Sequence, residues 1–270
     1  MPRMHLNYGN PVNRAHPLAR DLVAWWKVLP SWMGGGQLWD LCGRYPATLT
    51  NGPTWNGGRP GGFGSLKFPT PGSSRAVTGT VSHGIGTGPF TFSCWVNPIA
   101  INTAAYEGVM GNDNFSPGLY VNLPAAAKWG VYWAAEYSSG VALTVGAWQH
   151  TLATRNGSTI SFYLNGADTG TTASVATSMA NAAFCMGQAG PASGSNISLM
   201  DDVFFHARGF SASEAAMLYR ETQRPDNPML SWIRPVRVNS VAAPGGRTTR
   251  NTRAFPLGVS IGMDFNHCNI

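Results

Sequence analysis

Short segments of alternating apolar and polar residues run through most of the chain, separated by turns rich in glycine, proline and asparagine. The clearest is residues 89–98, PFTFSCWVNP, in which successive side chains fall on opposite faces of a strand. One face consists of Phe90, Phe92, Cys94 and Val96, and the other of Thr91, Ser93, Trp95 and Asn97. Further strands are expected at 21–29, 65–69, 118–123, 128–135, 148–155, 159–166, 183–187 and 198–206. Many short strands at this spacing predict an antiparallel β-sandwich or jelly roll.

One segment has helical periodicity. Ser211 is followed three residues later by Glu214, which is the pattern of a capping box, and Pro225 ends the segment. The apolar stripe of this expected short helix is Ala215, Leu218 and Tyr219. Glutamate and lysine, which long surface helices need, occur only four and three times in the chain. The composition therefore favours an all-β fold with one short helix.

The pattern divides the chain into three regions. Residues 1–20 contain three prolines and no periodicity, so we expect an extended N-terminal arm. Residues 21–223 carry the strands and the helix and are expected to form the sandwich. Residues 224–270 contain five prolines and two apolar patches, so we expect an extended Pro/Arg-rich C-terminal arm that becomes ordered on another molecule. No apolar run of ~18 residues predicts a transmembrane helix, and no secretory signal is seen.

Charge changes this picture at the two ends of the chain. Of the net charge of +6, residues 1–27 carry +3 and residues 224–270 carry +4, while residues 28–223 carry −1. All six basic residues of the last region are arginines, which form bidentate contacts with carboxylates and phosphates. The ends are therefore expected to dock on an acidic partner, with solvated tails as the alternative.

Several segments taken together resemble the laminin-G-like, concanavalin A-like jelly-roll family. They span residues 20–222 and read LVAWWKVLP, WDLCGRYPATLTNGPTW, SLKFP, GPFTFSCWVNP, GAWQHTLATRNGSTISFYLNG and LMDDVFFHARGFSASEAAMLY. The resemblance implies two packed antiparallel sheets and, for most members, a binding or structural role, often with a bound Ca²⁺. The segments NPVNRAHPLARDLVAWW, TLTNGPTW and RPDNPMLSWIRP also resemble stand-alone laminin-G-like proteins of tailed bacteriophages.

From this resemblance and the basic arms, we expect a structural protein of a bacteriophage virion, most specifically a decoration or auxiliary protein of the capsid. The arms would bind the major capsid protein or other virion proteins, the jelly roll would face outward, and copies of the chain would form a homo-oligomer. Assembly would take place in the host bacterial cytoplasm, with no direct contact to nucleic acid or membrane. The alternative is a carbohydrate-binding adhesin or lectin module for a host-surface glycan, and one molecule can combine both roles.

No catalytic constellation is visible in the sequence. Glycoside hydrolysis needs two carboxylates ~5–9 Å apart, and none of the four glutamates has a second carboxylate within four residues in an expected strand. A G-x-S-x-G segment, a phosphate loop and an H-x-x-x-H pair are also absent. We therefore expect a protein without enzymatic activity. His150 is expected to be a packed, hydrogen-bonded core residue.

Calcium is the one cofactor for which the sequence offers candidates. Asp201 and Asp202 are adjacent, so in a regular strand they point to opposite faces and only one can join a given site. The resemblance implies Asp201 as a ligand, with Asp40 and backbone carbonyls as partners. Ca²⁺ takes 6–8 oxygen ligands, and this chain has few carboxylates to offer. The alternative is that Asp201 accepts hydrogen bonds from backbone amides.

Carbohydrate binding is the family's common use, and sugar sites combine aromatic platforms with amide and carboxylate groups. The candidates in the middle of the chain are Trp129, Trp133, Asn112 and Asp113. The alternative for these aromatic residues is packing in the core or in an interface.

The residues expected to bind a partner lie in the C-terminal arm. They are Trp232, Ile233, Arg247, Arg250, Arg253, Phe255 and Phe265. The four cysteines are Cys42, Cys94, Cys185 and Cys268, and no two lie within ten residues of each other. This spacing excludes a CxxC metal motif. We expect free buried thiols, with a disulfide left open.

Overall fold

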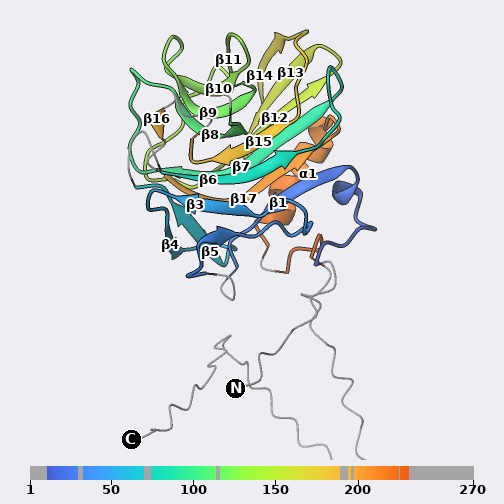
Figure 1. Cartoon of the computed structure of the whole chain (residues 1–270). Coiled ribbons are helices and arrows are strands. Elements are labelled where there is room, and N and C mark those ends of the chain that lie inside the picture. The colour runs from blue at the N-terminus through green and yellow to red at the C-terminus, as the bar shows by residue number, and fades with distance from the viewer. Residues whose placement is uncertain are drawn as a thin grey trace, which may run out of the picture. The chain divides into compact units, whose positions relative to one another are not determined.

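The computed structural model describes residues 11–29, 33–69, 74–113, 116–188, 194–195, 198–224 and 226–230. All of them belong to one unit of the chain, which ends at Arg234. The described residues are mostly β-structure, with one α-helix and one short 3₁₀ turn (Figure 1). Among them, no helix is long and apolar enough to cross a lipid bilayer.

Two sheets form the sandwich, as the alternation predicts. Within the described residues the first sheet has eight strands, in the order β14 (Ala167–Ser174), β13 (Thr159–Leu164), β12 (Gln149–Asn156), β7 (Phe90–Pro98), β17 (Ser198–His206), β5 (Gly64–Lys67) and β4 (Thr54–Gly57), with β1 (Leu22–Trp26) also bonded to β17. The second has nine, in the order β11 (Glu136–Ser138), β10 (Lys128–Tyr132), β9 (Gly118–Leu123), β8 (Glu107–Asn112), β15 (Ala182–Met186), β6 (Arg75–Val81), β3 (Ala47–Thr50) and β2 (Gln37–Leu38), with β16 (Gly194–Ser195) on β8. β16 runs parallel to β8, and the pairs that build the centre of each sheet are antiparallel.

The core between the sheets follows from the alternation in the strands. On β7 the predicted inner face is confirmed, because its two phenylalanines, Cys94 and Val96 are all fully buried in one continuous apolar cluster. Phe184 of β15 crosses the gap between the sheets and stacks on Trp26 of β1, with ring centroids 5.4 Å apart. Aromatic pairs of this kind fill the space between two sheets.

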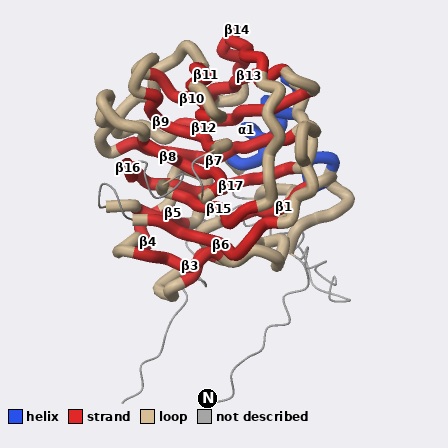
Figure 2. Tube along the Cα trace, turned by 45° about the horizontal axis from the view of Figure 1, so that its top comes forward, coloured by secondary structure: helices blue, strands red, loops and turns tan. Residues whose placement is uncertain are grey.

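The other face of the first sheet is covered as well, by the helix α1 (Ala212–Thr222). The predicted capping box is present: the Ser211 hydroxyl accepts from the backbone N–H of Glu214, and the Glu214 carboxylate accepts from the backbone N–H of Ser211. Leu218 of the helix is fully buried against a second apolar cluster. Figure 2 shows the helical segments together on one side of the stacked strands.

Residues 11–20 correct the prediction of an arm that extends to residue 20. They include the 3₁₀ turn η1 (Pro17–Ala19) and pack on the sandwich beside residues 226–230. Val12 forms an isolated antiparallel bridge with Leu230, and the Asn13 N–H donates to the Met229 carbonyl at 2.7 Å. The reason is apolar burial, because Leu18 is fully buried in the second cluster. The folded region therefore includes residues 11–20 and 226–230, and residues 1–10 and 231–270 lie outside the described residues.

The described cysteines fit the prediction of free thiols. Cys42, Cys94 and Cys185 form no disulfide with one another, and Cys268 lies outside the described residues. Burial raises the pKa of the Cys42 and Cys94 thiols to about 12 in each case. Both are therefore neutral and unreactive at physiological pH.

Candidate functional site

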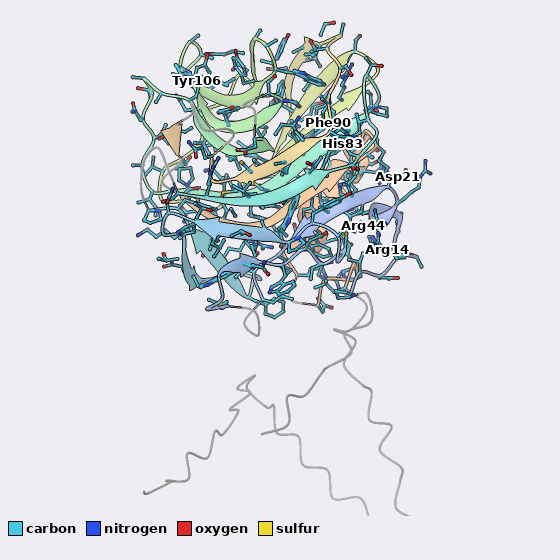
Figure 3. All side chains as sticks on the ribbon, in the orientation of Figure 1. Arg14, Asp21, Arg44, His83, Phe90 and Tyr106 are labelled. Carbon is cyan, nitrogen blue, oxygen red and sulfur yellow. The ribbon has the colours of Figure 1, made fainter. Side chains whose placement is uncertain are left out.

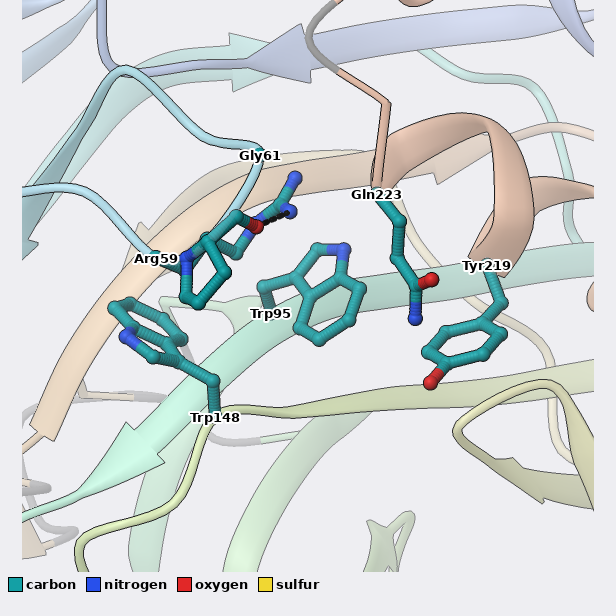
Figure 4. Close-up of a pocket in the computed structure, with 7 residues that line it drawn as sticks. Arg59, Gly61, Trp95, Trp148, Tyr219 and Gln223 are labelled. Carbon is teal, nitrogen blue, oxygen red and sulfur yellow. Dashed lines mark hydrogen bonds between the residues drawn. The ribbon is translucent and has the colours of Figure 1, made fainter.

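A pocket of about 510 Å³ lies on the outer face of the first sheet, where α1 ends. Figure 4 shows its parts: Trp95 of β7 at the centre, Trp148 from the turn before β12 on one side, and the end of α1 on the other. A loop after β4 completes the rim. The lining residues are Arg59, Pro60, Gly61, Trp95, Trp148, Tyr219 and Gln223.

Trp95 is placed by the strand alternation, which directs it away from the core. Its ring stacks on Tyr219 with centroids 5.5 Å apart and an interplanar angle of 26°. The indole N–H donates to the Thr222 hydroxyl at 2.9 Å. Because Thr222 and Tyr219 both belong to α1, the helix fixes the orientation of the central tryptophan. Trp148 and Tyr219 are half-buried and Gln223 is exposed, so these side chains face solvent in the pocket.

Arg59 closes the floor of the pocket from the loop side. Its guanidinium lies 4.3 Å from the centroid of the Trp95 ring, a cation–π contact. It also donates to the carboxylate of Asp202 and to the Thr222 carbonyl. The loop comes close to the helix end at Gly61, where φ is +77° and a Cβ would clash with the Gln223 carbonyl. Glycine is required at this position for both reasons.

Beneath the pocket lies a buried group of four charged residues, Lys27, Arg59, Asp201 and Asp202. The Lys27 ammonium donates to both oxygens of Asp202, at 2.9 and 2.8 Å, and lies 3.7 Å from Asp201. The Arg59 Nε lies 3.4 Å from the Asp201 carboxylate. Two cations thus face two carboxylates, and the group is electrically balanced.

The two carboxylates titrate in opposite directions. Burial, and after it the neighbouring charge of Asp202, raises the pKa of Asp201 above its ordinary value. Burial would also raise the pKa of Asp202, but Lys27 and Arg59 outweigh it and hold that pKa below its ordinary value. The two cations therefore stabilise Asp202 as the fully charged partner.

The prediction that adjacent Asp201 and Asp202 point to opposite faces is wrong. The pairing of β17 with β7 shifts register between Asp201 and Phe204, and Asp202 has a φ of +49°. A β-bulge turns the strand locally, so consecutive side chains can reach the same cations.

Both candidate calcium ligands, Asp201 and Asp40, form bonds within the fold. Asp201 is committed to Lys27 and Arg59 and accepts from the Val28 N–H at 3.2 Å. The bond from the Val28 N–H agrees with the alternative interpretation, in which Asp201 accepts hydrogen bonds from backbone amides. Asp40 accepts from four backbone N–H groups, those of Trp25, Cys42, Arg44 and Tyr45. Among the described residues no group of three or more histidine, cysteine or acidic side chains could hold a metal ion.

The structure does not bring the predicted glycan residues together on an exposed surface. Trp129 and Trp133 are buried in the core, where they pack edge-on against Phe162 and Phe90 respectively. Both side chains lie on the inner face of the second sheet. They therefore pack in the core, as the alternative interpretation expected.

The two polar candidates are likewise engaged within the fold. Asn112 is buried and donates to the Ala180 carbonyl at 3.2 Å. Asp113 accepts from Arg75 at 2.8 Å and from the Cys185 thiol at 2.7 Å. The seven predicted partner-binding residues, Trp232, Ile233, Arg247, Arg250, Arg253, Phe255 and Phe265, lie outside the described residues.

The pocket residues were not among the sequence candidates, although two signals for them were present. The alternation of residues 89–98 sets Trp95 on the face away from the core, and the helical stripe includes Tyr219. The sequence pattern did not predict that α1 docks over β7, which brings the two rings together. For Arg59, Trp148 and Gln223 the sequence contains no comparable signal.

Solved structures with the same fold have low sequence identity to this chain. Domain 4 of AbnA, an extracellular GH43 arabinanase from Geobacillus stearothermophilus in complex with arabinotriose, matches at 15% identity and a TM-score of 0.59, over 74% of this chain and 98% of that chain. The binding domain of Paraclostridial Mosquitocidal Protein 1 matches at 17% and 0.57, over 75% and 52%. A Trypanosoma rangeli sialidase mutant displaying trans-sialidase activity matches at 17% and 0.55, over 79% and 34%. This chain thus spans about a third of the sialidase.

The sequence itself carries a family match. No curated protein matches it, but the Laminin_G_3 family model, described as the concanavalin A-like lectin/glucanases superfamily, matches residues 71–216. That range includes β7, β12, β17 and the first five residues of α1, and two of the pocket's three aromatic rings, those of Trp95 and Trp148, lie within it. Because the match covers more than half of the chain, the protein belongs to the concanavalin A-like lectin/glucanases superfamily.

Proposed function

We propose that this protein is a non-catalytic carbohydrate-binding module and that the pocket beside α1 binds a neutral oligosaccharide. The observation that carries the proposal is the composition of the pocket wall, with three aromatic rings and the amide of Gln223 around one solvent-accessible space. Apolar walls with a few placed polar groups are the usual design of small-ligand sites. The C–H faces of a sugar ring pack on aromatic rings, and its hydroxyls bond to an amide.

The charge balance of the floor supports a neutral ligand. Arg59 is the one charged residue among those that line the pocket. Its guanidinium is bonded to Asp202 and stacked on Trp95, so it has little capacity left for an acidic sugar. With Lys27 and the two aspartates beneath it, the net charge of the floor is zero. An anionic ligand would gain no uncompensated partner here.

The same wall supports the absence of catalysis. No carboxylate is among the residues that line the pocket, whereas glycoside hydrolysis needs an acid and a base or nucleophile. Asp201 and Asp202 are fully buried under Arg59 and paired with cations. One structural neighbour, the arabinanase domain, was solved in complex with arabinotriose, and this supports a neutral sugar chain as the ligand class.

The test is binding to a panel of neutral and acidic oligosaccharides, measured by calorimetry on the full chain. We expect Trp148→Ala to weaken binding of the best neutral ligand by about tenfold, which corresponds to ~1.4 kcal/mol. Trp39→Ala is the matched control, because Trp39 is 45% exposed and is not among the residues that line the pocket. Equal affinity of the wild type and Trp148→Ala, or a preference for acidic sugars, would contradict the proposal.

Lack of catalysis is tested separately by incubating the protein with β-glucans, galactans and peptidoglycan and measuring released reducing ends. We expect no turnover. Hydrolysis that disappears in Glu107→Gln or Glu136→Gln would show that the second sheet carries an active site and that the protein is an enzyme.

A second candidate function is the structural role in a bacteriophage virion, and one observation favours it. Val12 and Leu230 are bridged, so the basic N-terminal and C-terminal segments leave the described part of the chain at neighbouring points. A protein tethered at one place leaves the rest of its surface free, which suits a decoration protein that also presents a glycan site. Its partners would be the major capsid protein or other virion proteins and further copies of itself.

Attachment to purified phage particles tests this second role by co-sedimentation at two salt concentrations. Changing Arg247, Arg250 and Arg253 together to Ser should weaken attachment at 0.1 M salt and matter less at 1 M, where the Debye length falls from ~10 to ~3 Å. Deleting residues 231–270 should abolish attachment at both. Full attachment of the truncated chain would contradict anchoring through the C-terminal arm.

A further inference from the structure

A second, more polar pocket of about 350 Å³ lies away from α1, where β1 begins. It opens between the N-terminal end of that strand and the loop that follows β6. Figure 3 shows Arg14, Asp21 and Arg44 close together on one side of the molecule. The lining residues are Arg14, Asp21, Leu22, Val23, Arg44, Ser82, His83 and Ala207.

Two guanidinium groups in this pocket lack an acidic partner. No carboxylate of the described residues forms an ion pair with Arg14 or Arg44 within 4.0 Å, and both residues are exposed. Of the nearby acids, Asp21 lines the pocket and pairs with Arg20 at 3.3 Å, and Asp40 accepts from four backbone amides. The pocket therefore offers the guanidinium of Arg44 and that of Arg14, which also bonds to the Cys42 side chain, and guanidinium groups suit carboxylate oxygens.

The remaining walls favour a peptide over a sugar. The one ring in the lining is that of His83, and both of its nitrogens are in use: Nδ1 accepts from the Ile85 N–H at 3.1 Å, and Nε2 bonds to the Ala180 carbonyl at 3.1 Å. The ring also packs edge-on against Phe205 at 5.4 Å. The pocket thus has no free aromatic platform for a sugar ring, in contrast to the pocket beside α1.

The start of β1 forms the apolar floor of this pocket. β1 pairs with β17 on one side, and on the other the Asp40–Leu41 segment reaches only Trp25 and Trp26. Leu22 and Val23 line the pocket, and no strand of the described chain is bonded to them on the side away from β17. Both residues are nearly fully buried, at 3% and 6% exposure, so they close the pocket toward the core.

We propose that this pocket binds an acidic, extended segment of a partner protein, whose carboxylates pair with Arg14 and Arg44. This site is separate from the proposed glycan pocket and does not depend on it, because the two share no lining residue.

The probe is the capped hexapeptide EVEVEV, with capped QVQVQV as the uncharged comparison, titrated against the full chain by calorimetry at 0.05 M and 0.5 M salt. We expect EVEVEV to bind at low salt and to weaken at high salt, because exposed charge pairs are screened. The double variant Arg14→Gln/Arg44→Gln should weaken binding at least tenfold. Arg220→Gln/Arg224→Gln removes the same charge at two exposed positions outside the pocket and should leave binding within twofold.

The outcomes separate the alternatives. Equal binding of EVEVEV and QVQVQV, equal loss in the two double variants, or no binding of EVEVEV at millimolar concentration would overturn the proposal. Inorganic phosphate is the third probe: competition by phosphate at the same concentration as the peptide would show a small-anion site and would also overturn it. Thermal unfolding of the same samples serves as the folding control.

Discussion

At the scale of single residues, two buried histidines lie on the outer side of the first sheet. His150 Nε2 bonds to the Ser93 hydroxyl at 2.7 Å, and His206 Nε2 bonds to the Leu18 carbonyl at 2.8 Å. Burial lowers the pKa of each imidazole from 6.5 to about 3. Above pH 6.5 both are neutral in the folded and the unfolded chain, so they leave stability unchanged there.

Below pH 6.5 these two imidazoles bind protons in the unfolded chain but not in the folded protein. Each histidine should then lower the free energy of unfolding by about 1.4 kcal/mol per pH unit. We therefore expect these two histidines to lower stability increasingly from pH 6.5 to 5, and the raised pKa values of Asp201 and Glu107 to act in the opposite direction. The variant His206→Gln should remove one histidine's share of the slope. Urea unfolding at several pH values measures it. An unchanged slope in His206→Gln would mean that this imidazole is protonated in the folded state.

Individual residues also show where sequence reasoning stops. His150 was predicted as a packed, hydrogen-bonded residue, and it is one, because a regular strand fixes its direction. Asp202 was predicted to point away from Asp201, and it does not, because a bulge breaks the alternation between them. Nothing in the local sequence LMDDVFF encodes the bulge. It becomes understandable only once Lys27 and Arg59, far away in the chain, are seen opposite both carboxylates.

At the scale of elements, the pocket forms because α1 packs on the outer face of the first sheet. The helix brings Tyr219 onto Trp95 and places Thr222 where it accepts the indole N–H. Its start is fixed by the capping box of Ser211 and Glu214, and Arg208 strengthens it with an ion pair to Glu214 at 2.6 Å. The helix was predictable from these local signals, but its docking site was not, because docking depends on the packing of distant strands.

The cap has a testable contribution to stability. Ser211→Ala removes the acceptor for the Glu214 N–H and should lower the free energy of unfolding by about 1 kcal/mol. Ser211→Asp is the matched control, because aspartate is an equally good N-cap residue. Thermal and urea unfolding of the three proteins measure the difference. Equal stability of Ser211→Ala and the wild type would show that tertiary packing alone holds the helix start.

At the scale of the whole molecule, the ends of the described chain belong to the sandwich. The prediction placed the borders of the folded region at residues 21 and 223, because prolines and the loss of periodicity begin there. Residues 11–20 and 226–230 nevertheless bury Val12, Leu18, Met229 and Leu230. Short apolar segments without periodicity cannot be recognised from the sequence as part of a fold. They become buried only because they pack on the surface of the first sheet.

This border predicts a difference between two truncations. A chain that ends at residue 230 should unfold at the same temperature as the full protein. A chain that ends at residue 224 loses Met229 and Leu230, each fully or nearly fully buried, and should be less stable by roughly 3 kcal/mol or more. Calorimetry of both truncated chains tests this. Equal stability of the two would place the end of the folded unit before residue 226.

The central claim is that the pocket beside α1 is the glycan site, and a crystal structure with the best-bound neutral oligosaccharide tests it most directly. We predict a sugar ring within about 4 Å of the Trp148 ring, a hydrogen bond to the Gln223 amide, and Arg59 still bonded to Asp202. A sugar bound instead on the outer face of the second sheet, with an empty pocket beside α1, would contradict the account.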